Sequence, residues 1–377
     1  MSTPGPFPVA AILRRAGALL ALLPALASAQ ILIGQTSGFS GPVAAGVKET
    51  TDGAKLWIDA VNARGGVNGQ RIELISMDDK FEPPLAAANA KKLITERGVI
   101  AIFLNRGTPH SEAIRPLLEE FKVPMIAPST GAMVLHRPVH PLIFNVRATY
   151  QREAEKAVQH LATIGTTRIA VLHVDDSFGL DAAAGAAKGF TEAKLQPTVV
   201  AKFNRSKPEF AAVASDIAAK DVQAVLFFGS GQAVVDGMRA IRNAGSRAQV
   251  VTLSNNASGG FVKLLGDMAR GTIVTQVFPN ERAVAVPFVK EATELAKAKG
   301  LPGVSPAMLE GFAAAKVLVE GLQRAGKQPT RESLTAALNG INGFDLGGLK
   351  VSYSPANHTG LTYAELSIIG ADGRFVR

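Results

Sequence analysis

Residues 168–203 read RIAVLHVDDSFGLDAAAGAAKGFTEAKLQPTVVAKF, and this stretch contains one complete strand–helix–strand unit. The apolar run at 168–174 predicts a buried strand, the alanine-rich run at 180–193 predicts a helix, and 198–203 predicts the next strand. Two strands joined through a helix lie parallel in one sheet, and the crossover between them is right-handed. The unit therefore predicts an α/β fold built on parallel sheets.

The same alternation of strands and helices runs through most of the chain and restarts once, after Val146. Strands such as Val225–Phe228 are apolar on both faces, which is typical of parallel strands covered by helices on each side. Two such series predict two doubly wound parallel-sheet lobes. Three helical segments follow one another at 286–299, 307–325 and 332–338, so we expect this part of the chain to return and cover an existing sheet.

The first 29 residues have the pattern of a secretory signal peptide. The basic pair Arg14-Arg15 precedes the apolar run 16–26, and the small residues Ala27-Ser28-Ala29 follow. A membrane anchor is the alternative, but a span needs roughly 20 apolar residues and this run has about half of that. No cysteine follows the apolar run, so a lipid anchor is not expected. We therefore expect a mature chain that begins at Gln30 and is exported to the periplasm.

Composition narrows the class of protein further. Of the 377 residues, 47% are hydrophobic and 19% are charged, and there is no cysteine, so neither disulfides nor cysteine-based chemistry are possible. The net charge of +9 falls to +7 when Arg14 and Arg15 are removed. Lysine and arginine are scattered instead of clustered, which argues against a nucleic-acid partner. We expect a monomer.

No motif predicts an enzyme. Residues 321–327 match the spacing of a phosphate-binding loop, but Gln328 replaces the metal-binding hydroxyl residue and the segment ends a helix. His136 and His140 are separated by proline, so no helix directs both to one metal. The acid pairs Asp78-Asp79 and Asp175-Asp176 follow strands and could bind a metal, but such pairs more often cap helices or turns. We therefore expect no catalytic residue, no metal and no cofactor.

Polar loops follow three of the predicted strands. They are residues 38–42, 105–111 and 128–131. The second of these loops leads into a helix expected to begin at Ser111. In open parallel sheets, ligands bind in the crevice beyond the carboxyl ends of the strands. Hydroxyl groups and backbone N–H groups at helix starts suit a carboxylate. Each hydroxyl taken alone is as consistent with a helix cap as with a ligand contact, but three such loops on one edge favour a binding site.

Four segments resemble the solute-binding proteins of branched-chain amino acid (Leu/Ile/Val-binding) ABC transporters: 38–42, 61–69 with Asp78-Asp79, 174–179 and 353–360. The likeness covers nearly all of residues 31–377 in the same order. It implies the type I periplasmic binding fold, with two lobes joined by three crossovers, a ligand cleft between them, and closure on binding. It also implies lobe I at 30–147 plus 278–347 and lobe II at 148–277 plus 348–377.

The resemblance also implies which residues bind the ligand. Thr108 corresponds to the hydroxyl that holds a carboxylate, and the other positions come from neighbouring loops. In full, the expected ligand-binding residues are Arg106, Thr108, Ser129, Thr130, Tyr150, Phe178, Ser230 and Asn255. The chain departs from the family at four places. Gly46 and Ser230-Gly231 stand where aromatic residues are common, 254–256 contains no acid to pair with an ammonium group, and Arg106 stands where the family has an apolar or small residue.

The expected ligand is a small carboxylate-bearing solute, either an organic acid or a branched-chain or aromatic amino acid. The departures favour an aromatic or branched organic acid without an α-amine, because a buried ammonium group needs an acid or several acceptors. Arg106 adds a cation suited to a carboxylate, although a surface salt bridge is the alternative role for it. Gly46 and Gly231 leave room that larger side chains would fill. Asp175, Asp176 or Glu281 could still supply the missing negative charge.

The resemblance implies an uptake component that delivers its ligand to an inner-membrane ABC permease. A periplasmic sensor module of the same fold, which feeds a signalling partner, is the alternative. Genes adjacent to this one distinguish the two, since a permease and an ATPase favour transport and a kinase favours sensing. A hydrolase on this fold is disfavoured, because no catalytic constellation is present.

Overall fold

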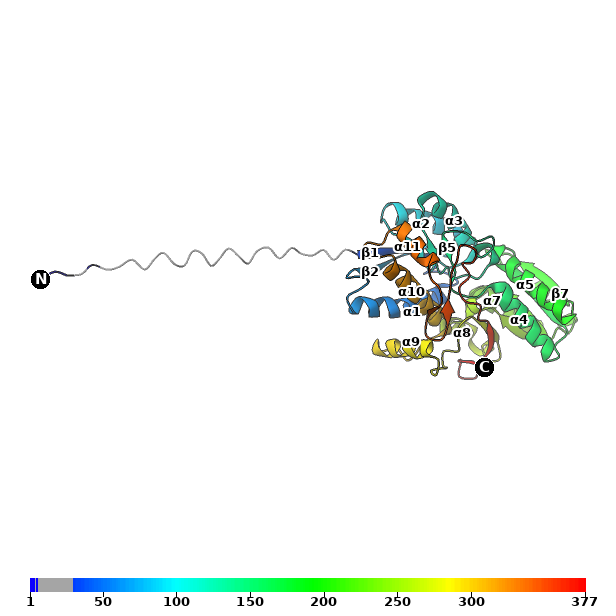
Figure 1. The fold of residues 1–377 in the computed structure, drawn as a ribbon. Coiled ribbons are helices and arrows are strands. Elements are labelled where there is room, and N and C mark those ends of the chain that lie inside the picture. The colour runs from blue at the N-terminus through cyan, green and yellow to red at the C-terminus, as the bar shows by residue number, and fades with distance from the viewer. Residues whose placement is uncertain (4, 6–29) are drawn as a thin grey trace.

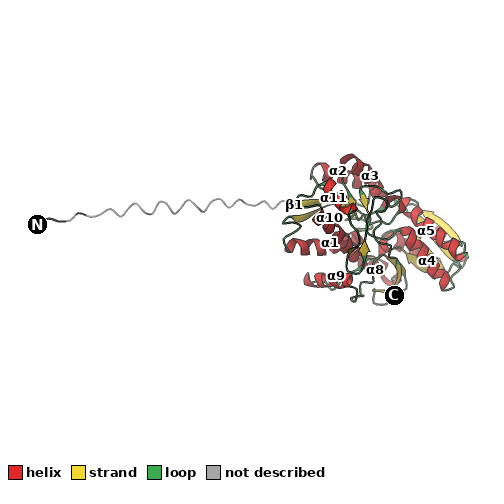
Figure 2. Cartoon of the chain, in the orientation of Figure 1, coloured by secondary structure: helices red, strands yellow, loops and turns green. Residues whose placement is uncertain are grey.

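The structure is a computed structural model that describes residues 1–3, 5 and 30–377. The expected signal peptide at 1–29 falls almost wholly outside these residues. The chain forms an α/β molecule with two separate sheets of mainly parallel strands, flanked by helices (Figures 1 and 2). In Figure 1 the blue and cyan part of the chain lies toward one end of the folded body and the green part toward the other.

The first sheet has five parallel strands in the order β2-β1-β3-β4-β5. They are β1 (Gln30–Ser37), β2 (Arg71–Asp78), β3 (Ala101–Phe103), β4 (Met125–Ile126) and β5 (Ile143–Phe144). Phe103 packs in a core with α1 (Ala44–Ala63) and α10 (Pro306–Arg324), and with α9 (Pro287–Ala298) and α11 (Arg331–Asn339). Its neighbour Ile102 packs on the opposite face with α2 (Pro83–Thr95) and α3 (Thr108–Phe121).

The second sheet has the order β14-β13-β10-β9-β8-β6-β7. Its parallel strands are β6 (Ile169–Val174), β7 (Val199–Phe203), β8 (Ala224–Phe228), β9 (Gln249–Thr252) and β10 (Ile273–Gln276). Two antiparallel strands extend it, β13 (Glu365–Ile369) and β14 (Phe375–Val376). Its helices are α4 (Tyr150–Thr163), α5 (Ser177–Ala193), α6 (Ala211–Ala219), α7 (Gln232–Asn243) and α8 (Gly259–Leu265). The expectation of two doubly wound parallel sheets is thereby confirmed, with an antiparallel edge added to the second.

The chain passes between the two sheets three times: between β5 and α4, between β10 and α9, and before β13. We propose lobe boundaries at the first two passes as inferred from the sequence. At the third pass, the core of the first sheet contains Val351, Tyr353, Leu361 and Ala364. The next core residue, Ile369, packs in the core of the second sheet. We therefore propose this third boundary after Ala364, whereas the sequence-based expectation put it after residue 347.

Several elements differ from the sequence expectation. The helix expected to begin at Ser111 begins at Thr108, because Gly107 serves as its N-cap and Pro109 is tolerated in a first turn. The short strand β5 and the helix α8 were not predicted. Within the stretch 343–353, two residue pairs form the small hairpin β11 (Phe344–Asp345) and β12 (Lys350–Val351). Within the described residues, no helix combines the length and apolar character that crossing a bilayer demands.

Candidate ligand-binding site

The strand order of the two sheets determines where a cleft forms. In each sheet the first strand along the chain lies between the second and the third, as β2-β1-β3 and as β7-β6-β8. At such a point in the strand order, the connections from two neighbouring parallel strands run to opposite faces of the sheet. The carboxyl ends of these two strands therefore border a crevice. Leu104 and Ala127, just beyond β3 and β4, adopt left-handed conformations with φ of 54° and 50°. These residues turn the chain into the loops that carry the predicted site.

Seven of the eight predicted residues line one small cavity between the sheets: Arg106, Thr108, Ser129, Tyr150, Phe178, Ser230 and Asn255. The eighth, Thr130, is buried behind the cavity, and its hydroxyl oxygen lies 2.7 Å from that of Thr108. The cavity measures about 10 Å³, close to the smallest volume that holds one water molecule. A ligand of amino-acid size therefore reaches these residues only if the lobes separate.

Arg106 is a buried cation in this cavity. It is 7% exposed, and its Nη2 donates to the backbone carbonyl of Asn255 at 2.5 Å. The ion pairs of the described residues include Arg147 and Arg205 but not Arg106, so the surface salt bridge considered from the sequence is not formed. Burial lowers the pKa of Arg106, although the guanidinium of an arginine stays charged in proteins. Arg106 is thus a positive charge without a carboxylate partner of its own.

Aromatic rings form a second wall of the cavity. Tyr150 begins α4 and Phe178 is the second residue of α5, and their ring centroids lie 4.8 Å apart in an edge-to-face arrangement. The Arg147 guanidinium carbon lies 4.7 Å from the Tyr150 ring centroid. Burial raises the pKa of the Tyr150 hydroxyl, so this group stays protonated and able to donate. The wall therefore offers apolar surface with one hydroxyl donor.

Arg147 anchors a buried network that the sequence analysis missed. Its Nη2 donates at 2.5 Å both to Glu153 Oε1 and to Ser254 Oγ, and its Nη1 lies 3.6 Å from Glu310 Oε2. Burial opposes the charge of Arg147, but Glu310, Tyr150 and Glu153 outweigh this effect and raise its pKa. The network joins the start of α4, the loop after β9 and α10. It therefore fixes Tyr150 and Asn255 relative to both lobes.

Asn255 contributes an unused acceptor. Its side-chain amide donates to Gly229 O and to Ser230 Oγ, each at 3.0 Å. Its Oδ1 is buried and has no hydrogen-bond partner within the described part of the chain. Asn255 therefore holds Ser230 at the cavity and leaves one carbonyl oxygen available to a donor.

Three further lining residues were not predicted: Gly107, which lies between Arg106 and Thr108, and also Phe81 and Arg205. Phe81 comes three residues after the end of β2, and Arg205 comes two residues after the end of β7. Both therefore lie in loops at the carboxyl ends of strands, which is the criterion that selected the predicted loops. The Arg205 guanidinium carbon lies 5.1 Å from the Phe81 ring centroid, and its Nη2 lies 2.5 Å from Asp176 Oδ2. The contact joins the first sheet's loop to the second sheet's loop across the cleft.

The carboxylates that could have bound a metal or an ammonium group either have other partners or lie outside the small cavity. Asp78 accepts the backbone N–H groups of Ser40 and Lys80, and Asp79 accepts that of Phe81. Asp176 caps α5, as the capping interpretation predicts. Asp175 pairs with Lys202 at the surface, and Glu281 is not among the cavity's lining residues. In the described ranges no three His, Asp or Glu residues cluster as metal ligands would.

The expected room at two glycines is absent. A Cβ at Gly46 would lie 3.1 Å from Arg106 Nη1, because the guanidinium occupies that space. A Cβ at Gly231, where φ is +53°, would lie only 1.9 Å from the carbonyl oxygen of Pro42. The expectation that Gly231 leaves room for a ligand is therefore wrong, since this glycine lets the backbones of the two lobes approach closely.

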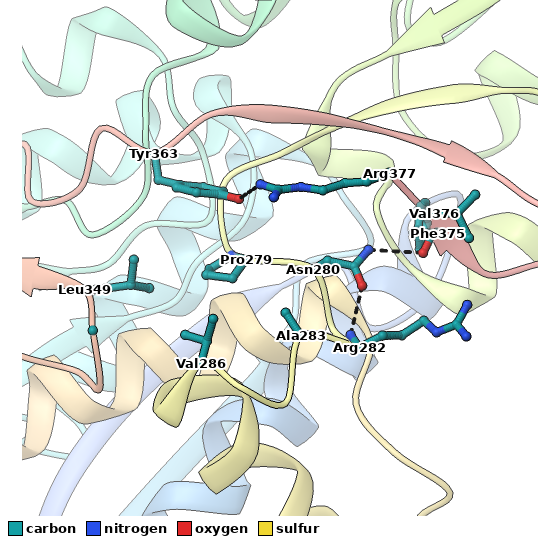
Figure 3. Close-up of a pocket in the computed structure, with 11 residues that line it drawn as sticks. Pro279, Asn280, Arg282, Ala283, Val286, Leu349, Tyr363, Phe375, Val376 and Arg377 are labelled. Carbon is teal, nitrogen blue, oxygen red and sulfur yellow. Dashed lines mark hydrogen bonds between the residues drawn. The ribbon is translucent and has the colours of Figure 1, made fainter.

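A larger cavity, of about 650 Å³, lies away from the predicted residues (Figure 3). It is formed by segments after β10, between β11 and β12, and around β13 and β14. Figure 3 shows Asn280 joined to Arg282 and to the Phe375 backbone, and Arg377 joined to Tyr363. Several of its polar groups already bind one another, and none of its lining residues lines the small cavity. We therefore take the smaller cavity as the candidate site.

A family model described as periplasmic binding protein matches residues 30–372. The chain belongs to this family. The resemblance drawn from the sequence is thereby confirmed, and the family is one of solute-binding proteins. Among relatives, the Leu/Ile/Val-binding protein BraC3 of Rhizobium johnstonii is 25% identical over 322 residues, which cover 85% of this chain and 86% of that protein.

Solved structures of similar proteins agree on the fold. A substrate-binding periplasmic protein from Ralstonia solanacearum is 31% identical, with a TM-score of 0.85, and the match covers 92% of this chain and 99% of that one. An extracellular ligand-binding receptor from Verminephrobacter eiseniae is 28% identical, with a TM-score of 0.84, over 93% of this chain and 100% of that one. The type I periplasmic binding fold with two lobes therefore holds for this chain.

The two lobes of this periplasmic binding protein contact each other beside the cavity. Glu49, on α1, accepts the backbone N–H groups of Gly259 and Gly260 at the start of α8, at 3.0 and 2.7 Å. Ser177, at the start of α5, donates to Glu112 on α3. With the Arg106–Asn255 contact, these bonds join loops and helices of both sheets and hold the cleft closed.

Proposed function

We propose that this protein is the periplasmic substrate-binding component of an ABC uptake transporter, and that its ligand is a small organic anion without an α-ammonium group. It would bind the ligand by closing its lobes and pass it unchanged to an inner-membrane permease. The observation that carries this proposal is the charge of the cavity. Arg106 lines it without a carboxylate partner, and no acid is among the lining residues.

The proposed contacts follow from the chemistry of the lining. A carboxylate would accept from Thr108 and Ser129 and from the Arg106 guanidinium, whose donors match its geometry. Tyr150 and Phe178 would pack against the apolar part of the ligand. An α-ammonium group would need a negative partner once buried. Glu310 is ion-paired with Arg147 and does not line the cavity, so it is a poor partner for such a group.

Calorimetry with matched ligands tests the proposal. 4-Methylpentanoate has the carbon skeleton of leucine without its amine, so we expect it to bind and leucine to bind at least tenfold more weakly. Arg106→Met should weaken 4-methylpentanoate roughly 10- to 100-fold, because a hydrogen bond to a charged group contributes about 1.5–3 kcal/mol. Arg97→Met changes an exposed arginine of the same lobe and should have no effect. Tight binding of leucine, with no response to the acid, would overturn the proposed ligand class.

The proposed location rests on residues 1–29. If these residues direct export and are then removed, protein recovered from the periplasm begins at Gln30, the residue that also begins β1. Its intact mass measures this directly. Retention of residues 1–29 in that material would contradict the proposal.

A further inference from the structure

A second cavity, of about 140 Å³, adjoins the candidate site, and we call it the outer chamber. Its walls and those of the small cavity share Phe81, Arg205 and Ser230. The two spaces are therefore neighbours separated by side chains. The remaining residues of the outer chamber are Pro42, Val174, Phe203, Pro208, Gln232, Ala233 and Asp236.

Of the three residues shared by the two spaces, Arg205 has the longest and most flexible side chain. Arg205 lies against the Phe81 ring, and Asp176 holds its guanidinium through Nε at 2.6 Å and Nη2 at 2.5 Å. The Arg205 side chain is 26% exposed, so it is only partly fixed by packing. A small displacement of this side chain would join the two cavities into one elongated site.

The walls of the outer chamber are mainly apolar. Proline, valine, phenylalanine and alanine supply most of them. The polar groups already have partners, since Gln232 Nε2 donates to Asp236 Oδ1 at 2.9 Å and Arg239 pairs with the same carboxylate. Nothing in this lining demands a polar group from a ligand. A cavity of about 150 Å³ with apolar walls accepts a benzene molecule, so the outer chamber has the size of one ring.

We propose that the outer chamber is a second subsite that accepts an aromatic ring of the ligand, with the Arg205 guanidinium against its face. This inference rests on the proposed function, because the carboxylate of the same ligand would lie against Arg106 in the small cavity. The ligand class is then aryl-substituted carboxylates, in which a short chain joins the ring to the carboxylate. Guanidinium groups stack readily on aromatic rings, and this supports a ring over a branched alkyl group.

The test uses the mature protein and a series of acids of increasing reach. Calorimetry measures the dissociation constants of propanoate, benzoate, phenylacetate, 3-phenylpropanoate and 4-phenylbutanoate. We expect one of the four aryl acids to bind at least tenfold more tightly than propanoate. Hexanoate, a flexible chain without a ring, should bind more weakly than that aryl acid. Similar affinity for all the acids would overturn the inference.

A cavity-filling variant locates the ring. Ala233→Phe places a side chain in the outer chamber, whereas Ala240→Phe changes another partly buried alanine of α7 that does not line it. Ala233→Phe should remove the tenfold gain of the best aryl acid and leave propanoate unchanged, and Ala240→Phe should preserve the gain. Equal weakening of propanoate and the aryl acid by Ala233→Phe would contradict the subsite. If this variant does not fold, the acid series on the unaltered protein decides alone.

Failure of this inference is distinguishable from failure of the proposed function. If short acids bind and Arg106→Met abolishes that binding, but the ring adds nothing, only the subsite is rejected. If no acid binds, or if binding does not depend on Arg106, the proposed function itself is rejected.

Discussion

At the scale of single residues, backbone geometry limits how closely the lobes approach. Gly231 lies against Pro42 of the other lobe, and its φ is +53°, which favours glycine. The contact exists only when the cleft is closed, since one residue comes from the loop after β8 and the other from the loop after β1. A side chain at this position would therefore oppose closure as well as strain the backbone.

We predict that Gly231→Ala weakens ligand binding at least tenfold, because its Cβ would meet the Pro42 carbonyl oxygen at 1.9 Å. Gly245→Ala is the matched control. Gly245 also has a positive φ, +87°, but a Cβ there meets no atom within 4 Å. Both variants should lose about 1 kcal/mol of folding free energy from the left-handed conformation, measured by chemical denaturation. Equal dissociation constants for the two variants would show that the contact does not limit closure.

Asp79 predicts a pH dependence of stability. Burial raises the pKa of Asp79 to about 6, against the opposing hydrogen bonds from the Phe81 N–H and the Thr36 hydroxyl. Its folded-state pKa exceeds the unfolded value of about 3.9, so the folded state binds more protons. Below pH 4 the Asp79 carboxyl makes its whole contribution to the free energy of unfolding. That contribution declines as the pH rises from 4 through 6.

Asp79→Asn removes this titration and keeps an oxygen that accepts the Phe81 N–H. We predict that the variant's free energy of unfolding rises relative to the unaltered protein by about 3 kcal/mol at most between pH 4 and 7. Chemical denaturation at pH 4, 5, 6 and 7 measures the difference. Asp267→Asn, at an exposed carboxylate, serves as the control and should follow the unaltered protein at every pH. Parallel curves for Asp79→Asn and the unaltered protein would refute the raised pKa.

At the scale of elements, α8 shows how one lobe completes a helix of the other. This helix has seven residues and begins with two glycines, so local propensity favours it little. Ser258 caps it by accepting the Phe261 N–H, and Glu49 of α1 accepts the first two N–H groups. The N-terminus of the helix is thus satisfied partly by a carboxylate from the other lobe, which favours the closed form.

We predict that Glu49→Gln weakens ligand binding three- to tenfold, because it replaces charge-assisted hydrogen bonds between the lobes with neutral ones. The change should leave the unliganded protein's folding free energy nearly unaltered if the open form lacks this contact. Calorimetry and thermal denaturation measure the two quantities. Glu96→Gln, an exposed residue just after α2, is the control. An unchanged dissociation constant for Glu49→Gln would exclude a role in closure.

At the scale of the whole molecule, the small cavity implies motion. Its volume of about 10 Å³ admits no organic acid, so binding requires an open form from which the lobes close on the ligand. We predict that the radius of gyration from small-angle scattering falls when 4-methylpentanoate saturates the protein. A hundredfold excess over the dissociation constant should also stabilise the fold by about 2.7 kcal/mol. Arg106→Met at the same ligand concentration should show neither change. Equal dimensions with and without saturating ligand would reject the clamp mechanism.

Local patterns in the sequence were enough to determine the two parallel sheets and the loops that carry the site. Runs such as Val225–Phe228 are apolar on both faces, and polar residues follow the strand ends, so both features depend on neighbours along the chain. The loops that contain Thr108 and Ser129 were found in this way, whereas the family resemblance supplied Phe178, and all three residues line one cavity.

Only the tertiary structure decided how these loops meet. The burial of Arg106 without a carboxylate, the network around Arg147 and the position of Arg205 against Phe81 all join residues far apart in the chain. The same is true of Gly231, whose role depends on Pro42 in the other lobe. Such contacts depend on how two lobes pack across a cleft. No hydrophobic period or sequence motif predicts these contacts between the lobes. Each residue is compatible with its own strand, helix or loop whether or not its partner in the other lobe is near.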